Sequence, residues 1–277
     1  MTDTPVTALA HDARSGRMAG DVAIVTGSTA GLGKEIARLF AAEGARVVVT
    51  GRNRERGEAI ASALRADGGE AVFIAADLTV EDDAHALIDT TIERYGALHV
   101  LVNNAVSPEI IARDGKAADV SNDVWESMLR VNVVGPAWLL RKAIPQMLEQ
   151  GRGSIVNISS RTAERASPRL AAYTASKGAM NALTRSITLD YGRNGIRCNT
   201  VQPGYILHEE RDVELTPERR RYIDDMCITR PPTALDVAYA VLFFASREAE
   251  CISGVTLQVD AGSSAGRGRT FDYPPAD

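Results

Sequence analysis

A tyrosine and a lysine four residues apart, Tyr173 and Lys177, form the pattern with the clearest chemical potential. On a helix, positions i and i+4 share a face, so the phenol and the ammonium would project into the same space. A free tyrosine has a pKa of about 10, and a nearby ammonium lowers that pKa by favouring the phenolate. Ser160, thirteen residues before the tyrosine, adds a hydroxyl that can hold a substrate oxygen. These side chains predict a site that moves a proton on or off an alcohol or carbonyl oxygen.

The Tyr-x-x-x-Lys pattern is short and common when it is taken alone. Its usual meaning is a partly exposed tyrosine that leans on the aliphatic stem of a lysine. A second motif near the N-terminus favours the chemical interpretation instead.

This second motif is a glycine-rich turn between an apolar run at residues 22–26 and a helical pattern that ends at Gly44. The β-branched residues of the run predict a buried parallel strand. A helix N-terminus after such a turn offers unpaired N–H groups and a positive dipole end, which attract a phosphate. The alternative is a set of glycines that only shape the turn. We expect a dinucleotide pyrophosphate here, held by Gly27, Ser28, Thr29, Gly31, Leu32 and Gly33.

The second apolar run, residues 45–50, ends in Gly51 and Arg52, where the adenosine ribose of a dinucleotide should lie. An acid at this point would accept a hydrogen bond from the 2′-hydroxyl of NAD. An arginine suits the 2′-phosphate of NADP instead, through its charge and its forked donors. The sequence therefore favours NADP(H), with NAD(H) as the alternative. The alternative for Arg52 is a solvated side chain on a polar turn, without a role in cofactor binding.

Strand and helix patterns alternate along the rest of the chain. Further strands are predicted at residues 72–75, 99–102, 154–158, 196–201 and 255–259. Helices are predicted at residues 54–66, 80–95 and 117–150, the last with an interruption near Asn132. A further helix carries Tyr173 and Lys177 and runs to about Tyr191. This alternation predicts one α/β domain, a doubly wound fold with a seven-stranded parallel sheet covered by helices on both faces. Ligands of such sheets bind at the carboxyl ends of the strands, where the chemically interesting residues all fall.

We expect three segments: a flexible N-terminal arm (1–18), the α/β domain (19–263) with a substrate lid at about 205–230, and a C-terminal tail (264–277). The lid is highly charged, and a solvated helical face would explain most of that charge.

The composition restricts the class of protein. A formal net charge of −5 without a basic run argues against nucleic acid as a partner. The three cysteines and four histidines form no spacing of metal ligands or disulfides. The N-terminus lacks the apolar core of a secretion signal, and no apolar run has the length of a membrane span. We therefore expect a soluble cytoplasmic protein that acts on a small molecule, without a metal.

Taken together, these residues resemble the short-chain dehydrogenase/reductase family over roughly residues 18–262. The resemblance rests on Thr26-Gly27-x-x-x-Gly31-x-Gly33, Asn103-Asn104-Ala105, Asn132, Ser160, Tyr173-x-x-x-Lys177 and Pro203-Gly204. It implies a Rossmann-like domain, a nicotinamide cofactor, and hydride transfer between a secondary alcohol and a ketone. It also implies a homo-oligomer, either a tetramer or a dimer.

The resemblance further assigns roles to individual residues. Tyr173 would be the general acid/base, Lys177 would lower the pKa of Tyr173 and bind the nicotinamide ribose, and Ser160 would orient the substrate oxygen. Asn132 would hold a water in a proton relay, which accounts for an amide in the middle of an apolar helix. Further cofactor contacts would come from Asn103, Asn104, Ala105, Pro203, Gly204 and Ile206. Asp77 and Leu78, which follow the strand predicted at residues 72–75, are placed to meet the adenine.

Some positions depart from the family pattern and are candidates for the substrate pocket. Val106 replaces a glycine that usually follows Asn-Asn-Ala, and His208 stands where a threonine usually helps to hold the cofactor amide. Arg161 could bind an anionic group of the substrate or form a surface salt bridge. Tyr205 begins the lid.

Two other functions are alternatives to an oxidoreductase. A cofactor-binding sensor or scaffold without catalysis is disfavoured, because all four catalytic positions are intact. A serine hydrolase that uses Ser160 is disfavoured as well, because Ser160 has no nucleophile-elbow sequence and no histidine partner motif.

Overall fold

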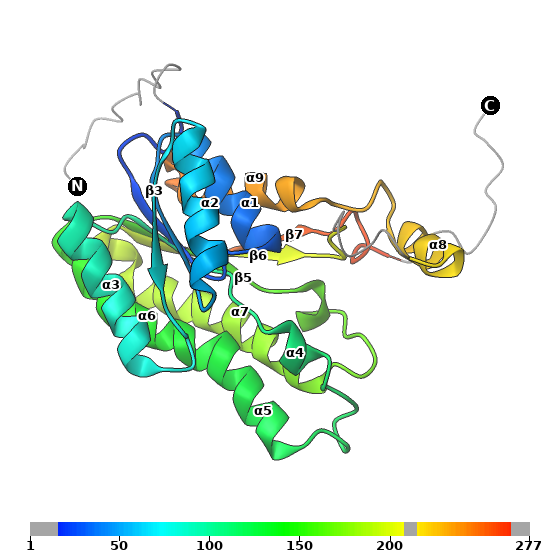
Figure 1. Cartoon of the computed structure of the whole chain (residues 1–277). Coiled ribbons are helices and arrows are strands. Elements are labelled where there is room, and N and C mark those ends of the chain that lie inside the picture. Colours follow the sequence, from blue (N-terminus) through cyan, green and yellow to red (C-terminus); the bar gives the residue numbers. More distant parts are fainter. Residues whose placement is uncertain (1–15, 208–214, 267–277) are drawn as a thin grey trace, which may run out of the picture.

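The computed structural model describes residues 16–207 and 215–266. A parallel sheet of seven strands, in the order β3-β2-β1-β4-β5-β6-β7, forms the centre of the domain (Figure 1). The fold class predicted from the sequence is confirmed. The strands are β1 (Val22–Val25), β2 (Arg46–Gly51), β3 (Glu70–Ala75), β4 (Val100–Asn103), β5 (Gly153–Ile158), β6 (Ile196–Pro203) and β7 (Thr256–Val259).

Helices cover the sheet on both faces. They are α1 (Gly31–Ala42), α2 (Arg54–Ala66), α3 (Glu81–Tyr95), α4 (Pro108–Ile111), α5 (Asn122–Leu129), α6 (Gly135–Glu149), α7 (Ala171–Tyr191), α8 (Pro217–Met226) and α9 (Ala234–Ala245). A π-helical turn (Arg130–Val134) joins α5 to α6, and 3-10 turns lie at Arg161–Ala163, Gly192–Asn194 and Arg247–Ala249.

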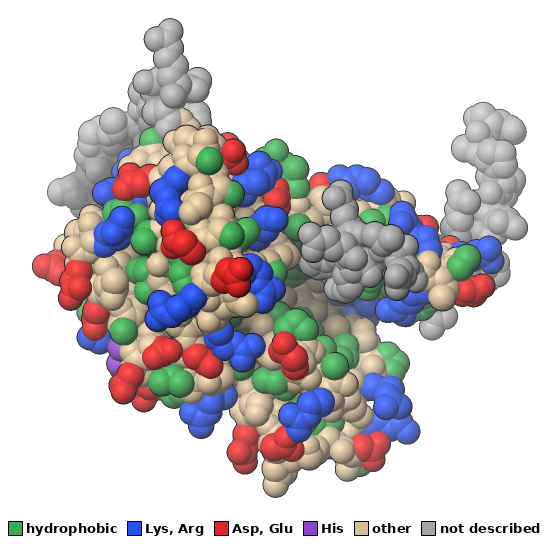
Figure 2. All heavy atoms as spheres, in the orientation of Figure 1, with side chains coloured by type: hydrophobic (Ala, Val, Ile, Leu, Met, Phe, Trp, Pro, Cys, Tyr) green, Lys and Arg blue, Asp and Glu red, His purple; other side chains and the backbone are tan. Residues whose placement is uncertain are grey.

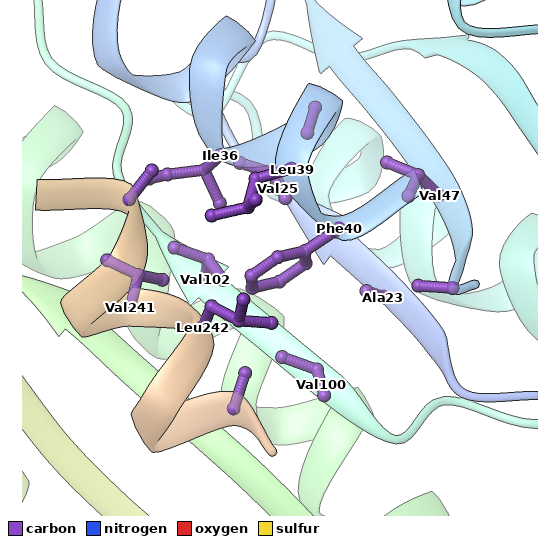
Figure 3. Packing of buried hydrophobic residues seen from close by; sticks show 14 of the residues in the cluster. Ala23, Val25, Ile36, Leu39, Phe40, Val47, Val100, Val102, Val241 and Leu242 are labelled. Atoms are coloured by element: carbon purple, nitrogen blue, oxygen red, sulfur yellow. The ribbon is translucent and has the colours of Figure 1, made fainter. Parts of the chain in front are cut away.

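The alternation of side chains along each strand divides the core into two layers. In β1, Ala23 and Val25 face the layer that contains α1, α2 and α9, whereas Ile24 faces the layer that contains α3 and α6. Figure 3 shows the first layer, in which Phe40 of α1 lies against strand residues and Leu242 of α9. Because both faces of the sheet are covered, the central strand β1 (VAIV) and the middle of β2 (VVV) are apolar without alternation, as expected for a parallel sheet.

Helix α9 was not predicted from the sequence. Its residues are almost all apolar, so it lacks the polar stripe by which a surface helix is recognised. A capping box, in which Thr233 and Asp236 bond each other's backbone N–H groups, marks its start. This box was the available sequence signal. The short helix α4 was also missed.

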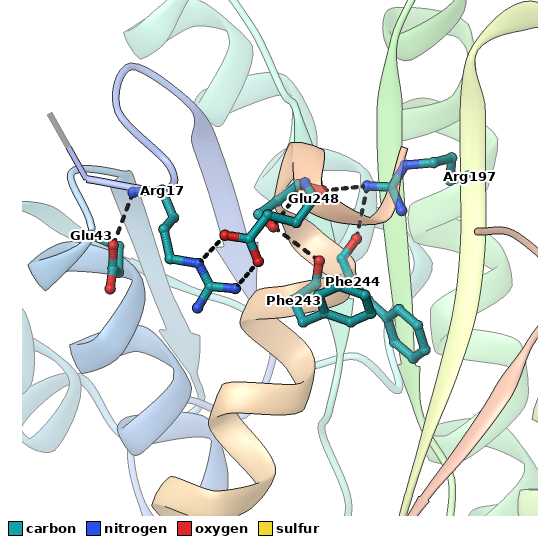
Figure 4. Close-up of polar contacts among 7 residues, drawn as sticks. Arg17, Glu43, Arg197, Phe243, Phe244 and Glu248 are labelled. Carbon is teal, nitrogen blue, oxygen red and sulfur yellow. Dashed lines mark hydrogen bonds and ion pairs between the residues drawn. The ribbon is translucent and has the colours of Figure 1, made fainter. Parts of the chain in front are cut away.

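Polar contacts fasten the start of the described chain to α1 and to the end of α9 (Figure 4). The backbone N–H of Arg17 donates to Glu43 (2.9 Å), and its guanidinium pairs with Glu248. The neighbouring Arg197 donates to the carbonyls of Phe244 (2.8 Å) and Ser246 (3.1 Å). The sequence had assigned Arg17 and Met18 to a flexible arm, but Met18 is fully buried, so these two residues belong to the domain. Residues 1–15 of the predicted arm and residues 267–277 of the tail lie outside the described residues.

Candidate active site

Helix α7 and the end of β5 bring together the three side chains that were predicted to do chemistry. Tyr173 and Lys177 lie one turn apart on α7, with Nζ of Lys177 5.7 Å from the centre of the Tyr173 ring. Nζ also donates a hydrogen bond to the carbonyl of Ile158 at the end of β5 (2.8 Å). Ser160 follows β5 directly and is hydrogen-bonded to the phenol of Tyr173.

Burial controls the protonation of this group. It raises the pKa of the Tyr173 phenol, and the hydrogen bond with Ser160 opposes this rise. Burial also lowers the pKa of the Lys177 ammonium to about 8. The sequence had predicted a lowered pKa for Tyr173, so the direction differs, because desolvation of the phenol outweighs any attraction by the ammonium. The phenol of Tyr173 is therefore neutral at neutral pH.

Thr162 orients the hydroxyl of Ser160. Its backbone N–H (3.2 Å) and its hydroxyl (3.0 Å) both donate to Oγ of Ser160. Because these bonds occupy the acceptor lone pairs, the proton of Ser160 is free to point toward another oxygen. Sequence reasoning missed Thr162, although a threonine two residues after a serine that starts a turn can form such bonds.

Asn132 lies in the π-helical turn between α5 and α6, where the sequence had predicted an interruption of the helix. Its amide nitrogen donates to Oγ of Ser176 (2.9 Å), and Ser176 in turn donates to the carbonyl of Tyr173 (2.7 Å). Its amide oxygen is buried and has no hydrogen-bond partner among the described residues. Such π-turns often mark functional sites, and an unpaired buried oxygen can accept a hydrogen bond from a water.

Asp114 caps α7 from a distant loop. Its carboxylate accepts hydrogen bonds from the backbone N–H groups of Tyr173 (2.8 Å) and Ala172 (3.2 Å), and also from that of Gly115 (2.8 Å). Leu170, which precedes the helix, supplies no side-chain cap. Asp114 therefore joins the loop between α4 and α5 to the turn that carries Tyr173, and a carboxylate is favourable at a helix N-terminus. Sequence reasoning missed this residue, because the contact is made only by the tertiary fold.

Under the acid/base role that the resemblance implies for Tyr173, replacing Asp114 with alanine should lower kcat about 10-fold, because a loosened first turn misplaces the phenol. The lost cap should also lower the free energy of unfolding by about 1–2 kcal/mol. Asp114→Asn should restore much of kcat, since its amide oxygen still accepts. Asp119→Ala, on the same loop and exposed, is the matched control. Steady-state kinetics and thermal melts would measure both effects, and an unchanged kcat in Asp114→Ala would show that the cap does not position Tyr173.

The glycine turn between β1 and α1 is tightly packed against the loop after β4. Gly27 has a φ of 65°, which favours glycine. A Cβ atom on Gly33 would lie 2.4 Å from the carbonyl oxygen of Gly27 and 2.5 Å from the amide nitrogen of Asn104. Asn104 is held in place, because its side chain donates to the carbonyl of Thr26 (2.7 Å). These contacts leave no room for a side chain at Gly33.

The N-terminus of α1 is open to a ligand. The helix starts at the exposed Gly31, its N-cap residue Ala30 makes no side-chain hydrogen bond, and its first turn has no acid. These N–H groups fit a phosphate. The hydroxyl of Ser28 is buried, donates to the carbonyl of Val25 (2.6 Å) and accepts from the N–H of Thr50 (3.0 Å). Its side chain therefore holds the turn. Of the other predicted contacts at this turn, Thr29 is partly exposed and Leu32 is buried.

The predicted adenosine contacts lie after β2 and β3. Arg52 is exposed, and its guanidinium lies 4.0 Å from the carboxylate of Glu109 in α4. Asp77 accepts hydrogen bonds from the N–H (2.9 Å) and the hydroxyl (2.8 Å) of Thr79, so one of its carboxylate oxygens shapes this turn. Leu78 is buried behind it.

The predicted nicotinamide and substrate contacts follow β4 and β6. Asn103 is buried, and its amide donates to the side chain of Asn157 (2.8 Å). Ala105 is half-buried, and Val106 is 40% exposed, so its side chain is available to a ligand. Pro203 ends β6, and a Cβ atom on Gly204 would lie 2.9 Å from Cα of Asp260.

Helix α8 projects from the body of the domain as part of the predicted lid, and Figure 2 shows a hollow between this projection and the body. Tyr205 stacks near the guanidinium of Arg219 (5.9 Å), and Ile206 packs against the core. A guanidinium nitrogen of Arg161 lies 4.0 Å from the sulfur of Met226 at the end of α8. His208 lies outside the described residues.

Comparison with known proteins identifies the family. The family model of the short chain dehydrogenases matches residues 21–218. The chain belongs to the short-chain dehydrogenase/reductase family. It is thus an oxidoreductase, and the resemblance noted in the sequence is confirmed.

Several relatives of this short-chain dehydrogenase match it over nearly the whole domain. An uncharacterized oxidoreductase of Thermotoga maritima is 36% identical over 89% of this chain and 98% of its own length. The 4-formylbenzenesulfonate dehydrogenase TsaC1/TsaC2 of Comamonas testosteroni is 37% identical over 87% of this chain and 96% of its own. A crystal structure of gluconate 5-dehydrogenase from Burkholderia cenocepacia, in complex with NADP and tartrate, is 32% identical. It superimposes with a TM-score of 0.83 over 90% of this chain and 97% of its own.

In the described part of this short-chain dehydrogenase, no cluster of three or more histidine, cysteine or acidic side chains could hold a metal ion. Among the described helices, none is both long enough and apolar enough to cross a membrane.

Proposed function

We propose that the protein interconverts a secondary alcohol and a ketone with a nicotinamide dinucleotide, preferring NADP(H), and that Tyr173 is the general acid/base. The observation that carries the proposal is the placement of Tyr173, Ser160 and Lys177 together at the carboxyl end of the sheet. The glycine turn opens at the same end. Ligands of doubly wound sheets bind at this end.

The residues at the glycine turn fit a dinucleotide. The uncapped N-terminus of α1 would bind the pyrophosphate. Gly27 and Gly33, which are packed closely together, have no side chains that could obstruct the phosphate. When bound, the nicotinamide ring supplies or accepts the hydride. Thr29, Leu78, Ala105, Pro203, Gly204 and Ile206 remain proposed cofactor contacts.

The side chains of this protein would transfer the proton to and from the substrate oxygen. Ser160, whose lone pairs are used by Thr162, would donate a hydrogen bond to the substrate oxygen and hold it beside the phenol. Tyr173 would give its proton to that oxygen during reduction and take it back during oxidation. Lys177 would bind the ribose beside the phenol, and the free amide oxygen of Asn132 would hold a water that resupplies the proton.

Arg52 supports the preference for NADP(H). Arg52 follows β2 directly, and Gly51, the last residue of β2, is not an acid that would bind a 2′-hydroxyl. The NADP complex of the gluconate 5-dehydrogenase neighbour is consistent with this assignment.

We propose an anionic substrate on the strength of Arg161. The side chain is half-buried beside Ser160, and its one hydrogen-bond contact in the described part of the chain is the sulfur of Met226. An arginine in this position can bind a carboxylate or sulfonate. The names of two relatives, a 4-formylbenzenesulfonate dehydrogenase and a gluconate 5-dehydrogenase, also refer to anionic compounds. Val106, Tyr205 and His208 remain proposed pocket residues.

A cytoplasmic homo-oligomer, either a dimer or a tetramer, completes the proposal. Free thiols at Cys198, Cys227 and Cys251 are consistent with a reducing compartment. The family resemblance supports the oligomer.

Titration with NADPH and NADH, followed by nicotinamide fluorescence, tests the proposal. NADPH should bind more tightly, and Arg52→Ala should weaken NADPH binding by about 10-fold or more while leaving NADH unchanged. The preferred cofactor is then supplied with keto acids and their methyl esters, of which the acids should be turned over faster. Binding of neither dinucleotide would overturn the proposed function, and a preference for NADH would overturn only the role of Arg52.

A further inference from the structure

An ion pair spans the glycine turn from one side to the other. Arg52 follows β2, and Glu109 belongs to α4, which follows β4. A guanidinium nitrogen of Arg52 lies 4.0 Å from Oε2 of Glu109. Because β1 lies between β2 and β4, and neighbouring strands are about 4.8 Å apart, the two side chains bridge roughly twice that spacing. The pair therefore passes over the end of β1, where the glycine turn begins.

Glu109 is held in this position by a second contact. The hydroxyl of Ser107 donates a hydrogen bond (2.6 Å) to Oε2 of Glu109, the same oxygen that faces Arg52. This hydrogen bond and, to a smaller degree, the charge of Arg52 hold the pKa of Glu109 below its ordinary value. Glu109 is therefore a fixed negative charge at neutral pH.

Arg52 is only weakly bound to Glu109. The side chains are 65% and 74% exposed, and exposed pairs at such a distance are weak. Within residues 16–207 and 215–266, Glu109 is the one acidic side chain within ion-pair distance of Arg52. A phosphate dianion, which can accept two parallel hydrogen bonds from a guanidinium, is a stronger partner than this carboxylate.

We propose that Glu109 competes with the ribose 2′-phosphate of a dinucleotide for Arg52 and so limits the preference for NADP(H) over NAD(H). The inference rests on the proposed function. When Arg52 turns to the phosphate, the charge of Glu109 loses its partner and faces a second anion nearby, which disfavours the complex. A 2′-hydroxyl carries no charge and does not need Arg52. Glu109 therefore weakens the binding of NADP(H) but not that of NAD(H).

The test compares the dissociation constants of NADPH and NADH for the wild type and Glu109→Gln at low ionic strength, where exposed charges are least screened. NADPH should bind Glu109→Gln about 5-fold more tightly, while NADH should change less than about 2-fold. Ser107→Ala, which frees the carboxylate from its tether, should shift NADPH binding in the same direction by a smaller factor.

A matched control separates competition from net charge. Glu55→Gln also removes one negative charge, three residues from Arg52 and outside ion-pair distance of it. Glu55→Gln should leave both dissociation constants unchanged. In the Arg52→Ala background, Glu109→Gln should improve NADPH binding by less than it does in the wild type, because no competition remains. An equal gain from Glu55→Gln, or an equal gain with and without Arg52, would overturn the inference.

The outcomes also distinguish this inference from the proposed function. If Arg52→Ala weakens NADPH binding but Glu109→Gln leaves it unchanged or weakens it, only the role of Glu109 is wrong. If neither dinucleotide binds any variant, the proposed function fails first.

Discussion

Tyr173→Phe should reduce kcat/KM for a carbonyl substrate by about 10³-fold or more, at the upper end of what one general acid contributes. Phenylalanine keeps the ring, which is half-buried on α7, and removes only the hydroxyl that bonds Ser160. NADPH affinity and the thermal midpoint should therefore stay close to the wild-type values. Single-turnover oxidation of NADPH by a ketone, followed by absorbance, measures the loss directly.

Tyr191→Phe is the matched control for this substitution. Tyr191 lies at the other end of the same helix and packs against the α3/α6 layer of the core. The control should retain wild-type turnover. If Tyr173→Phe also keeps a near-normal rate, Tyr173 is not the acid/base, whatever its position.

The wild-type pH profile follows from the raised pKa of Tyr173. Reduction needs the neutral phenol, so its rate should hold through neutral pH and fall as the phenol ionises. Oxidation needs the phenolate and should rise over the same range. A reduction rate that already falls near neutral pH would instead support the lowered pKa that the sequence suggested.

Local patterns in the sequence were sufficient to predict the strand and helices that carry this site. The strand before Gly27, the helix of the glycine turn and the i, i+4 spacing of Tyr173 and Lys177 are all features of neighbouring residues. The structure has all three, although the helix begins at Gly31 and not after Gly33. Even the break in the helix at Asn132 was detectable, because an amide in an apolar stretch has no local partner.

The features that the sequence did not reveal depend on distant parts of the chain. Asp114 reaches Tyr173 across 59 residues, and nothing in the loop itself indicates that its carboxylate caps a helix. The direction of the Tyr173 pKa depends on how deeply the fold buries the phenol, which spacing cannot show. The hydroxyl of Ser28 also turned inward, because β2 offers it the N–H of Thr50.

Gly33→Ala should nearly abolish dinucleotide binding, with a loss of affinity of about 100-fold or more, although the added group is a single methyl. The new Cβ would lie 2.4 Å from the carbonyl oxygen of Gly27 and 2.5 Å from the amide nitrogen of Asn104. Neither atom can easily move away, since the oxygen of Gly27 belongs to the backbone and the amide nitrogen of Asn104 is hydrogen-bonded to the carbonyl of Thr26 (2.7 Å). The turn must shift away from α1, which displaces the N–H groups that would bind the pyrophosphate. Overpacking of this kind also costs about 1–3 kcal/mol of stability.

Gly192→Ala is the control that separates this clash from a general effect of replacing glycine. Gly192 has a helical backbone (φ −59°), and a Cβ atom built on it meets nothing within 4 Å. This variant should bind NADPH normally and melt at or slightly above the wild-type temperature, because alanine is favoured over glycine in helical geometry. Fluorescence titration and thermal melts compare the two variants. Normal NADPH binding by Gly33→Ala would mean that the dinucleotide does not depend on this turn, and the cofactor site would have to be sought elsewhere at the carboxyl end of the sheet.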